Sequence, residues 1–249
     1  MTLCEFLERY VFVRKCILCG ERLGYEYRNE AFCDACRISF ERAKTECCPE
    51  CNMSMSDCRC LPKRLSNVGV IEHRKLFAYR KNEPTRPENR LVLYLKDNKV
   101  GRVASFAAGQ LSHRLDELLA SEKLDRRDVV ITFIPRSRRS YVRYGIDQAR
   151  FVAEALGDVS RIPCVPLVKR LHDGKPQKKL SLNERLKNTA GMFEVNERCA
   201  REVSARAVIL YDDVVTTGIS VSRAAQELRR YGFERIYVLS LATVPVSKR

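Results

Sequence analysis

The sequence of 249 residues lacks any uninterrupted apolar run near the ~20 residues that a membrane-spanning helix needs. Its first residues, Met1-Thr2-Leu3-Cys4-Glu5, lack the basic stretch and apolar core of a secretory signal. Its three histidines show no spacing typical of a metal site, so we assign none of them to metal. Hydrophobic residues make up 45% of the chain, too many for a disordered protein. We therefore expect a soluble, cytoplasmic protein of one large domain or two modest ones.

Cysteine is scarce in most of the chain, because only Cys164 and Cys199 of the 12 cysteines lie beyond residue 60. Charge divides near the same place. Residues 1–62 carry a net charge of −1 and residues 63–249 carry +16, which together give the +15 of the chain. The composition therefore predicts a small cysteine-rich domain over 1–62 and a larger domain over 63–249.

Eight cysteines of the N-terminal region fall into closely spaced pairs. Two cysteines two residues apart can direct both thiolates at one ion from a tight turn, and two such turns complete a tetrahedral zinc site. A disulfide framework is the alternative, but a reducing cytoplasm opposes it. We predict a double zinc ribbon with two Zn²⁺ ions; sequential pairing is the simplest arrangement, and an interleaved one stays open. The candidate ligands are Cys16, Cys19, Cys33, Cys36, Cys48, Cys51, Cys58 and Cys60.

Four thiolates leave zinc no open coordination position, so these ions would be structural and not catalytic. A region of about 45 residues buries little apolar surface, and metal binding would supply the missing folding free energy. The simplest interpretation is a clip that stabilises the fold, and a docking surface for a protein comes next. Eight thiolates on two Zn²⁺ would make this region more negative, which disfavours nucleic acid as its partner.

The most informative segment runs from Ala207 to Ser220. Its apolar stretch over 208–211 is typical of a strand buried on both faces of a parallel sheet. Asp212 and Asp213 follow at the carboxyl end of that strand, where open α/β sheets bind ligands. A small hydroxylated loop then leads into a predicted helix, whose N-terminal N–H groups can hold a phosphate. The loop side chains are Thr216, Thr217, Gly218 and Ser220.

Two acids beside a phosphate loop fit a ribose 5-phosphate, with its phosphate in the loop and its hydroxyls, or a bound Mg²⁺, on the acids. The alternative is a plain strand-turn-helix unit in which the acids only cap the helix. Alternating strands and helices predict an α/β fold with a mostly parallel sheet. The expected strands are 76–82, 129–134, 163–168, 192–195, 208–211 and 236–243, and the expected helices are 102–119, 146–156 and 222–230.

This segment resembles the motif of type I phosphoribosyltransferases that binds phosphoribosyl pyrophosphate (PRPP). The order of motifs over nearly the whole chain resembles the ComF family of bacterial competence proteins. At 144–148 the chain departs from the family's usual Arg-Gly-Phe-Asn-Gln at three of five positions. Besides the cysteine knuckles, the motifs are Leu93-Tyr94-Leu95-Lys96-Asp97, Ile134-Pro135-Arg136, Tyr144-Gly145-Ile146-Asp147-Gln148-Ala149, Arg170, Gln177, Leu180, Asn183-Glu184-Arg185, Asn188 and Gly191-Met192-Phe193.

The resemblance implies a type I phosphoribosyltransferase-like sheet flanked by helices. If the domain is catalytic, it implies displacement of pyrophosphate at the ribose C1, with Mg²⁺ joining pyrophosphate and ribose hydroxyls. Asp212 and Asp213 would be the catalytic pair on the ribose, and the loop 216–220 would bind the 5′-phosphate. A flexible loop over 171–188 would close the site. Further candidates for the pyrophosphate or the loop are Arg136, Gln148, Arg170 and Arg185.

Two segments of the larger domain are strongly basic. Residues 126–150 hold seven arginines against two acids, and residues 161–187 hold eight basic residues against two acids. These side chains could neutralise pyrophosphate, follow a nucleic-acid backbone or be solvated faces. The charge of the whole domain favours affinity for single-stranded DNA, although aromatic residues are sparse here and no base-reading motif is visible.

The resemblance to the ComF family implies a role in DNA uptake by natural transformation, with other competence proteins as candidate partners of the cysteine-rich domain. Two alternatives remain. One is a nucleotide-salvage phosphoribosyltransferase, although the sequence offers no obvious base for a nucleobase acceptor. The other is a PRPP-sensing module that binds the ligand without turnover.

Overall fold

The computed structural model describes residues 13–27, 29–97, 101–171 and 191–244, together with Phe6 and Val11. Its centre is a four-stranded sheet with the order β1-β6-β5-β2. All three neighbouring pairs are parallel, so the carboxyl ends of the strands meet at one edge of the sheet. The strands are β1 (Val70–Ala78), β2 (Val129–Phe133), β5 (Ala207–Val215) and β6 (Arg235–Thr243).

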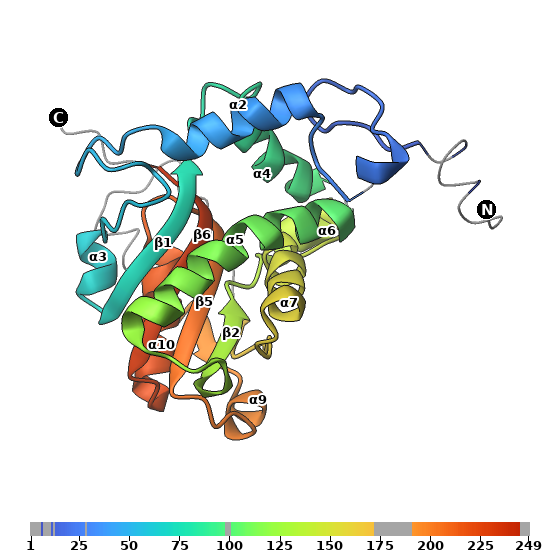
Figure 1. Cartoon of the computed structure of the whole chain (residues 1–249). Helices are drawn as coiled ribbons and strands as arrows, with labels where there is room; N and C mark the ends of the chain where they lie inside the picture. The colour runs from blue at the N-terminus through green and yellow to red at the C-terminus, as the bar shows by residue number, and fades with distance from the viewer. Residues whose placement is uncertain are drawn as a thin grey trace.

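Helices cover both faces of this sheet (Figure 1). On one face, α5 (Gly101–Glu122) and α7 (Gln148–Ser160) bury their apolar sides against residues that include Ile209 and Tyr211 of β5. On the other face, α10 (Ile219–Tyr231) packs in a core with Val208 and Leu210 of the same strand. Alternate side chains of β5 therefore enter two cores, which is why its first half is apolar at every position.

The cysteine-rich region packs on the larger domain through α2 (Asp34–Thr45), which lies beyond the end of β1 in Figure 1. The ring of Phe40 in α2 lies 5.9 Å from that of Phe77 in β1 and 5.6 Å from that of Phe106 in α5, centroid to centroid. Phe40 and Phe77 are fully buried. The boundary near residue 62 stays a prediction, and residues on both sides of it share one apolar core.

The remaining elements of the described chain are short or peripheral. A two-stranded antiparallel sheet joins β3 to β4. None of the helices in the described part of the chain combines the length and apolar character needed to cross a bilayer. These elements are η2 (Tyr25–Tyr27), α3 (Lys63–Ser66), α4 (Pro87–Asp97), η3 (Arg126–Asp128), α6 (Arg138–Tyr144), β3 (Val168–Arg170), β4 (Phe193–Val195) and α9 (Glu197–Arg201).

The predicted fold class is confirmed as a parallel sheet flanked by helices with a small cysteine-rich region at the N-terminus. Individual limits differ from the prediction. The strand expected at 76–82 begins at Val70, because the polar run over 72–75 is buried here and conceals the strand pattern. The strand expected at 163–168 is reduced to a bridge from Cys164 to Ile131 followed by β3.

Candidate functional site

The paired acids lie inside β5, because the strand continues through them to Val215 and stays paired with β6. Asp212 and Asp213 are both partly buried and both line a cavity of about 400 Å³ at the carboxyl edge of the sheet. They do not cap α10, whose N-cap residue is Gly218. The alternative of simple helix caps therefore does not describe them. Other walls of the cavity come from Lys96, Arg136, Ser137, Tyr144, Asp147, Gln148, Arg170 and Ser220.

Asp213 is held in place by two neighbours from other elements. The side-chain amide of Gln148, at the start of α7, donates a hydrogen bond to Asp213 Oδ2. Lys96 Nζ, in the last turn of α4, lies 3.8 Å from the same oxygen. Gln148 is buried, and its Oε1 has no hydrogen-bond partner within the described residues. A buried acceptor of this kind is costly unless a ligand satisfies it.

The surroundings of Asp212 disfavour the ionised form of its carboxyl. Burial raises the pKa of its carboxyl well above the usual range, and the charge of Asp213 raises it further, while Lys96 opposes both. Its Oδ1 accepts a hydrogen bond of 3.0 Å from the backbone N–H of Asp213. A carboxyl of raised pKa can donate to a ligand oxygen or, once ionised, bind a cation. The pair is thus suited to vicinal hydroxyls or to a divalent cation.

Arg136 brings positive charge to the lining of the same cavity. Its guanidinium lies 4.3 Å from the ring centroid of Tyr144 and donates to the carbonyl oxygen of Ile146 at 3.0 Å. Its backbone N–H donates to Asp147 Oδ2 at 2.9 Å. Burial raises the pKa of Asp147, against backbone N–H groups that stabilise the carboxylate. Arg136 is therefore held rigidly, as binding of an anionic ligand requires.

The loop after β5 has the backbone geometry of an anion site. Gly218 adopts φ = 69°, in the left-handed region, and no side chain caps α10. The first N–H groups of that helix consequently have no partner within the helix. Ser220 faces the 400 Å³ cavity, whereas Thr216 and Thr217 are exposed and line a second cavity of about 850 Å³ on the other side of the loop.

The predicted zinc ligands form two separate clusters, each made of four sequential cysteines. Within each cluster the four sulfur atoms lie within 4.8 Å of one another, and Cys19 Sγ lies 3.6 Å from Cys33 Sγ. Tetrahedral zinc with Zn–S bonds of about 2.3 Å needs sulfur atoms about 3.8 Å apart, so the donors fit the metal. The clusters are Cys16, Cys19, Cys33 and Cys36, and Cys48, Cys51, Cys58 and Cys60.

The two clusters begin with the same kind of turn. Gly20 follows Cys19 at φ = 78°, and Asn52 follows Cys51 at φ = 59°, so each knuckle ends on a residue type that tolerates the left-handed region. Burial would raise the pKa of Cys16, but backbone N–H groups from its own turn and from Cys33 outweigh burial and lower it to about 7. Backbone N–H groups of the second turn likewise outweigh burial and lower the pKa of Cys48.

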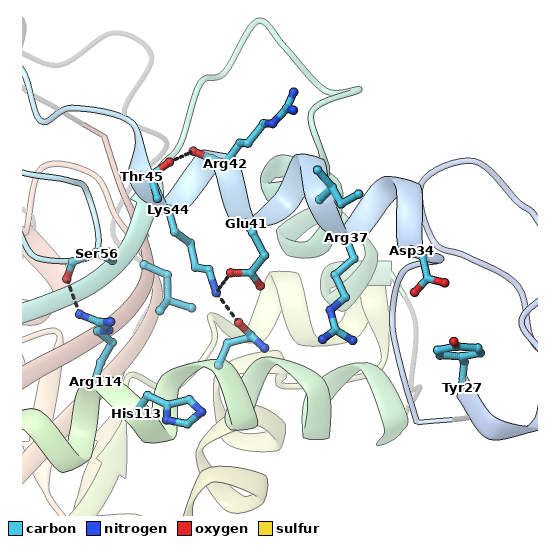
Figure 2. A pocket seen from close by; sticks show the side chains of 13 residues that line it. Tyr27, Asp34, Arg37, Glu41, Arg42, Lys44, Thr45, Ser56, His113 and Arg114 are labelled. Atoms are coloured by element: carbon cyan, nitrogen blue, oxygen red, sulfur yellow. Dashed lines mark hydrogen bonds and ion pairs between the residues drawn. The ribbon is translucent and has the colours of Figure 1, made fainter.

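A larger hollow of about 870 Å³ lies between α2 and α5 (Figure 2). It contains none of the predicted site residues. Two of its cations have protein partners: Lys44 Nζ lies 2.5 Å from Glu41 and 2.7 Å from Gln110, and Arg114 donates to the carbonyl oxygen of Ser56 at 3.2 Å. We therefore interpret this hollow as part of the contact between the cysteine-rich region and the larger domain.

The structure brings most of the predicted ligand-binding residues to one cavity. Arg136, Gln148 and Arg170 surround the paired acids, while Arg185 and nearly all of the predicted closing loop lie outside the described residues. Sequence reasoning assigned no role to Lys96 or Asp147, although both stood in motifs that carried the family resemblance. Their places in those motifs, 93–97 for Lys96 and 144–149 for Asp147, were the available signal.

A parallel α/β domain with a paired-acid ligand cavity, joined to two four-cysteine clusters, is the class of protein that this geometry defines. The chain is 24% identical to competence protein ComFC of Streptococcus pneumoniae over 241 residues, which cover 91% of this chain and 99% of that protein. It is 34% identical to competence protein F of Haemophilus influenzae over 101 residues, which cover 40% of this chain and 44% of that protein. These similarities confirm the predicted resemblance of the chain to the ComF family of competence proteins.

A solved structure described as the allosteric regulatory enzyme of purine biosynthesis matches 60% of this chain and 30% of its own chain, at 16% identity and with a TM-score of 0.37. No protein-family model matches the sequence.

Proposed function

We propose that this protein binds PRPP or a related ribose phosphate in the 400 Å³ cavity and acts in DNA uptake during natural transformation. The observation that carries the ligand proposal is the pairing of Asp212 and Asp213 with the uncapped N-terminus of α10 at one edge of the sheet. The similarity to two competence proteins supports the biological role.

Each chemical group of the ligand would contact residues suited to bind it. The ribose hydroxyls would bind Asp212 and Asp213, with the unpaired oxygen of Gln148 as a further acceptor. The 5′-phosphate would bind the N–H groups at the start of α10 together with Ser220. Arg136 and Lys96 offer positive charge to the pyrophosphate. Mg²⁺, held by the paired acids and the ligand oxygens, would neutralise charge on the pyrophosphate.

The cysteine clusters are proposed to hold two structural zinc ions. Each offers four thiolates in a compact set, which suits zinc and leaves no position open for a substrate. Burial raises the pKa of other ligands, Cys36 and Cys60 among them, so zinc would stabilise thiolates that the metal-free clusters disfavour. Chelation should therefore destabilise the cysteine-rich region.

Single-stranded DNA is proposed as the macromolecular partner, with α6 beside the cavity as part of the contact surface. This helix exposes Arg138, Arg139 and Arg143, and the side chain of Tyr141 is 53% exposed among them. Arginine can follow a phosphate backbone, and an exposed aromatic ring can stack on a base. Of the other aromatic residues in this segment, Phe133 is buried in the sheet and unavailable.

The ligand proposal is tested by calorimetric titration of the protein with PRPP and Mg²⁺. The double variant Asp212→Asn with Asp213→Asn should lose at least about 100-fold in affinity, because each hydrogen bond to a charged group contributes about 1.5–3 kcal/mol. Asp158→Asn with Glu202→Gln removes the same charge from exposed positions and should bind as the wild type does. Equal affinity in both double variants would contradict the role of the paired acids.

The proposed role is separated from the alternatives by assays on the same proteins. Salt-sensitive binding of single-stranded DNA without turnover of a nucleobase would support it. Steady release of pyrophosphate with one nucleobase would instead identify a salvage enzyme. PRPP binding that changes affinity for a partner protein, without turnover and without DNA binding, would identify a sensor.

A further inference from the structure

Strand β1 lies at the edge of the sheet, yet it buries four consecutive polar residues, 72–75. Three of them have evident partners. Glu72 forms an ion pair with Arg74 at 2.9 Å, and His73 Nε2 lies 2.8 Å from Ser240 Oγ. Lys75 is as deeply buried as the other three residues. It differs from them because no carboxylate among the described residues pairs with its ammonium group.

The ammonium group of Lys75 points at the second cysteine cluster. Its Nζ donates a hydrogen bond of 2.8 Å to the backbone carbonyl oxygen of Cys60. Lys75 also lines the 850 Å³ cavity together with Cys48, Cys58 and Cys60. With Lys75 only 1% exposed, its charge is cut off from water, and a buried charge without compensation is strongly destabilising.

Zinc bound by four thiolates carries a net charge of −2, so the second cluster would supply the counter-charge that Lys75 lacks. We propose that Lys75 is a positioning residue of the second zinc site, where its buried ammonium group balances the zinc–thiolate cluster and joins that cluster to the sheet. This inference rests on the proposal that the cysteines bind zinc. It explains why a lysine occurs in the middle of a buried strand.

The position of Lys75 connects the metal site with the ligand site. Lys75 is the register partner of Ser240 in β6, which is itself the register partner of Asp212 in β5. Thr216 and Thr217, of the loop that follows the acids, line the same cavity as the second cluster. The second cluster therefore contacts the sheet at the residue of β1 that lies level with Asp212 across β6. It also lines one cavity together with the loop that follows the acids.

The test compares Lys75→Met with Lys63→Met in the full-length protein. Methionine keeps the length and apolar stem of lysine, so Lys75→Met removes the charge with little loss of packing. Lys63 lines the same cavity but is exposed, so Lys63→Met removes the same charge where water already screens it. The two measurements are zinc retained against a competing chelator, and stability to urea with zinc bound and after its complete removal.

The wild type and Lys63→Met should each retain two zinc ions, whereas one ion of Lys75→Met should be held about 10- to 100-fold more weakly, as found when outer-shell partners of metal ligands are lost. In the metal-free proteins Lys75→Met should have the opposite effect and raise stability to urea. Without zinc the charge of the zinc–thiolate cluster is lost, Lys75 is a buried cation that no carboxylate of the described residues balances, and Lys75→Met should be more stable to urea than the wild type.

Two results would overturn the inference alone. If Lys75→Met retains both zinc ions as tightly as Lys63→Met, the ammonium group does not balance the cluster, although the zinc proposal stands. If Lys75→Met is destabilised equally with and without zinc, Lys75 contributes packing alone. A wild-type protein purified with fewer than two zinc ions would refute the zinc proposal itself, and this inference with it.

Discussion

Replacement of Asp212 by asparagine should stabilise the ligand-free protein while it destroys the proposed ligand site. Burial and the charge of Asp213 raise the pKa of the Asp212 carboxyl well above its usual range, so ionisation opposes folding. Asparagine has the same shape, and its Oδ1 can keep the 3.0 Å hydrogen bond from the backbone N–H of Asp213. The substitution therefore removes an unfavourable charge with few other changes.

The stability that Asp212→Asn gains over the wild type depends on pH, and the raised pKa of Asp212 fixes the direction of that dependence. Below about pH 4 the carboxyl is protonated in both the folded and the unfolded chain, and it contributes no difference. As the pH rises from there to the folded-state pKa, the unfolded chain loses the proton that the folded chain keeps. Wild-type stability should fall relative to Asp212→Asn by about 1.4 kcal/mol per pH unit over this range and stay level above it.

The assay is urea or thermal unfolding of both proteins between about pH 5 and pH 8, at equal zinc content because metal binding itself depends on pH. Each unit by which the pKa is raised should appear as about 3–6 °C in Tm for a protein of this size. Asp158→Asn, on the exposed surface of α7, should change stability by less than about 0.5 kcal/mol at every pH.

A stability difference between the wild type and Asp212→Asn that does not change with pH would refute the reasoning. A less stable variant at neutral pH would do so as well. The expected outcome, a more stable protein that no longer binds PRPP, would identify Asp212 as a residue kept for the ligand at the expense of stability.

The remaining predictions concern the phosphate loop and the DNA surface. Gly218→Ala should lower the free energy of unfolding by about 1–2 kcal/mol, because alanine is strained at φ = 69°. Gly109→Ala, in a helix where an added Cβ meets open space, should raise the free energy of unfolding by about 0.5–1 kcal/mol. Equal effects of the two substitutions would contradict the loop geometry. Arg143→Gln should reduce the slope of log K for single-stranded DNA binding, plotted against log salt concentration, by about 0.7 in magnitude. Tyr141→Ala should cost about 1–3 kcal/mol of DNA affinity with an unchanged salt slope, and no loss would exclude stacking on this ring.

Much of the fold could be predicted because its signals are local. The apolar run before the paired acids and the spacing along 102–119 report burial directly, and they match β5 and most of α5. The first strand could not be placed from such signals. Its residues 72–75 are polar, and their burial depends on Ser240, on Glu117 in α5 and on the second cysteine cluster, which no local pattern reveals.

The candidate site was predictable where its residues are consecutive and not where they come from several elements. The acids and the loop after them were identified as one motif. Lys96 and Asp147 escaped assignment because their proximity to the acids and to Arg136 arises from the packing of α4 and the entry to α7 around the strand ends. The loop also proved to have two sides, since Ser220 and the threonine pair face different cavities.

The sequence by itself determined the cysteine spacing, the alternation of strands and helices and the acids before a phosphate loop, because each of these features depends on residues that are close in sequence. Only the tertiary structure decided which cysteines gather, which cations face the acids and which buried cation has no carboxylate partner among the described residues. Those properties depend on distances between segments far apart in the chain. Lys75 shows the difference most clearly, because its ammonium group donates to the carbonyl oxygen of Cys60, 15 residues earlier, and no sequence pattern indicates that contact.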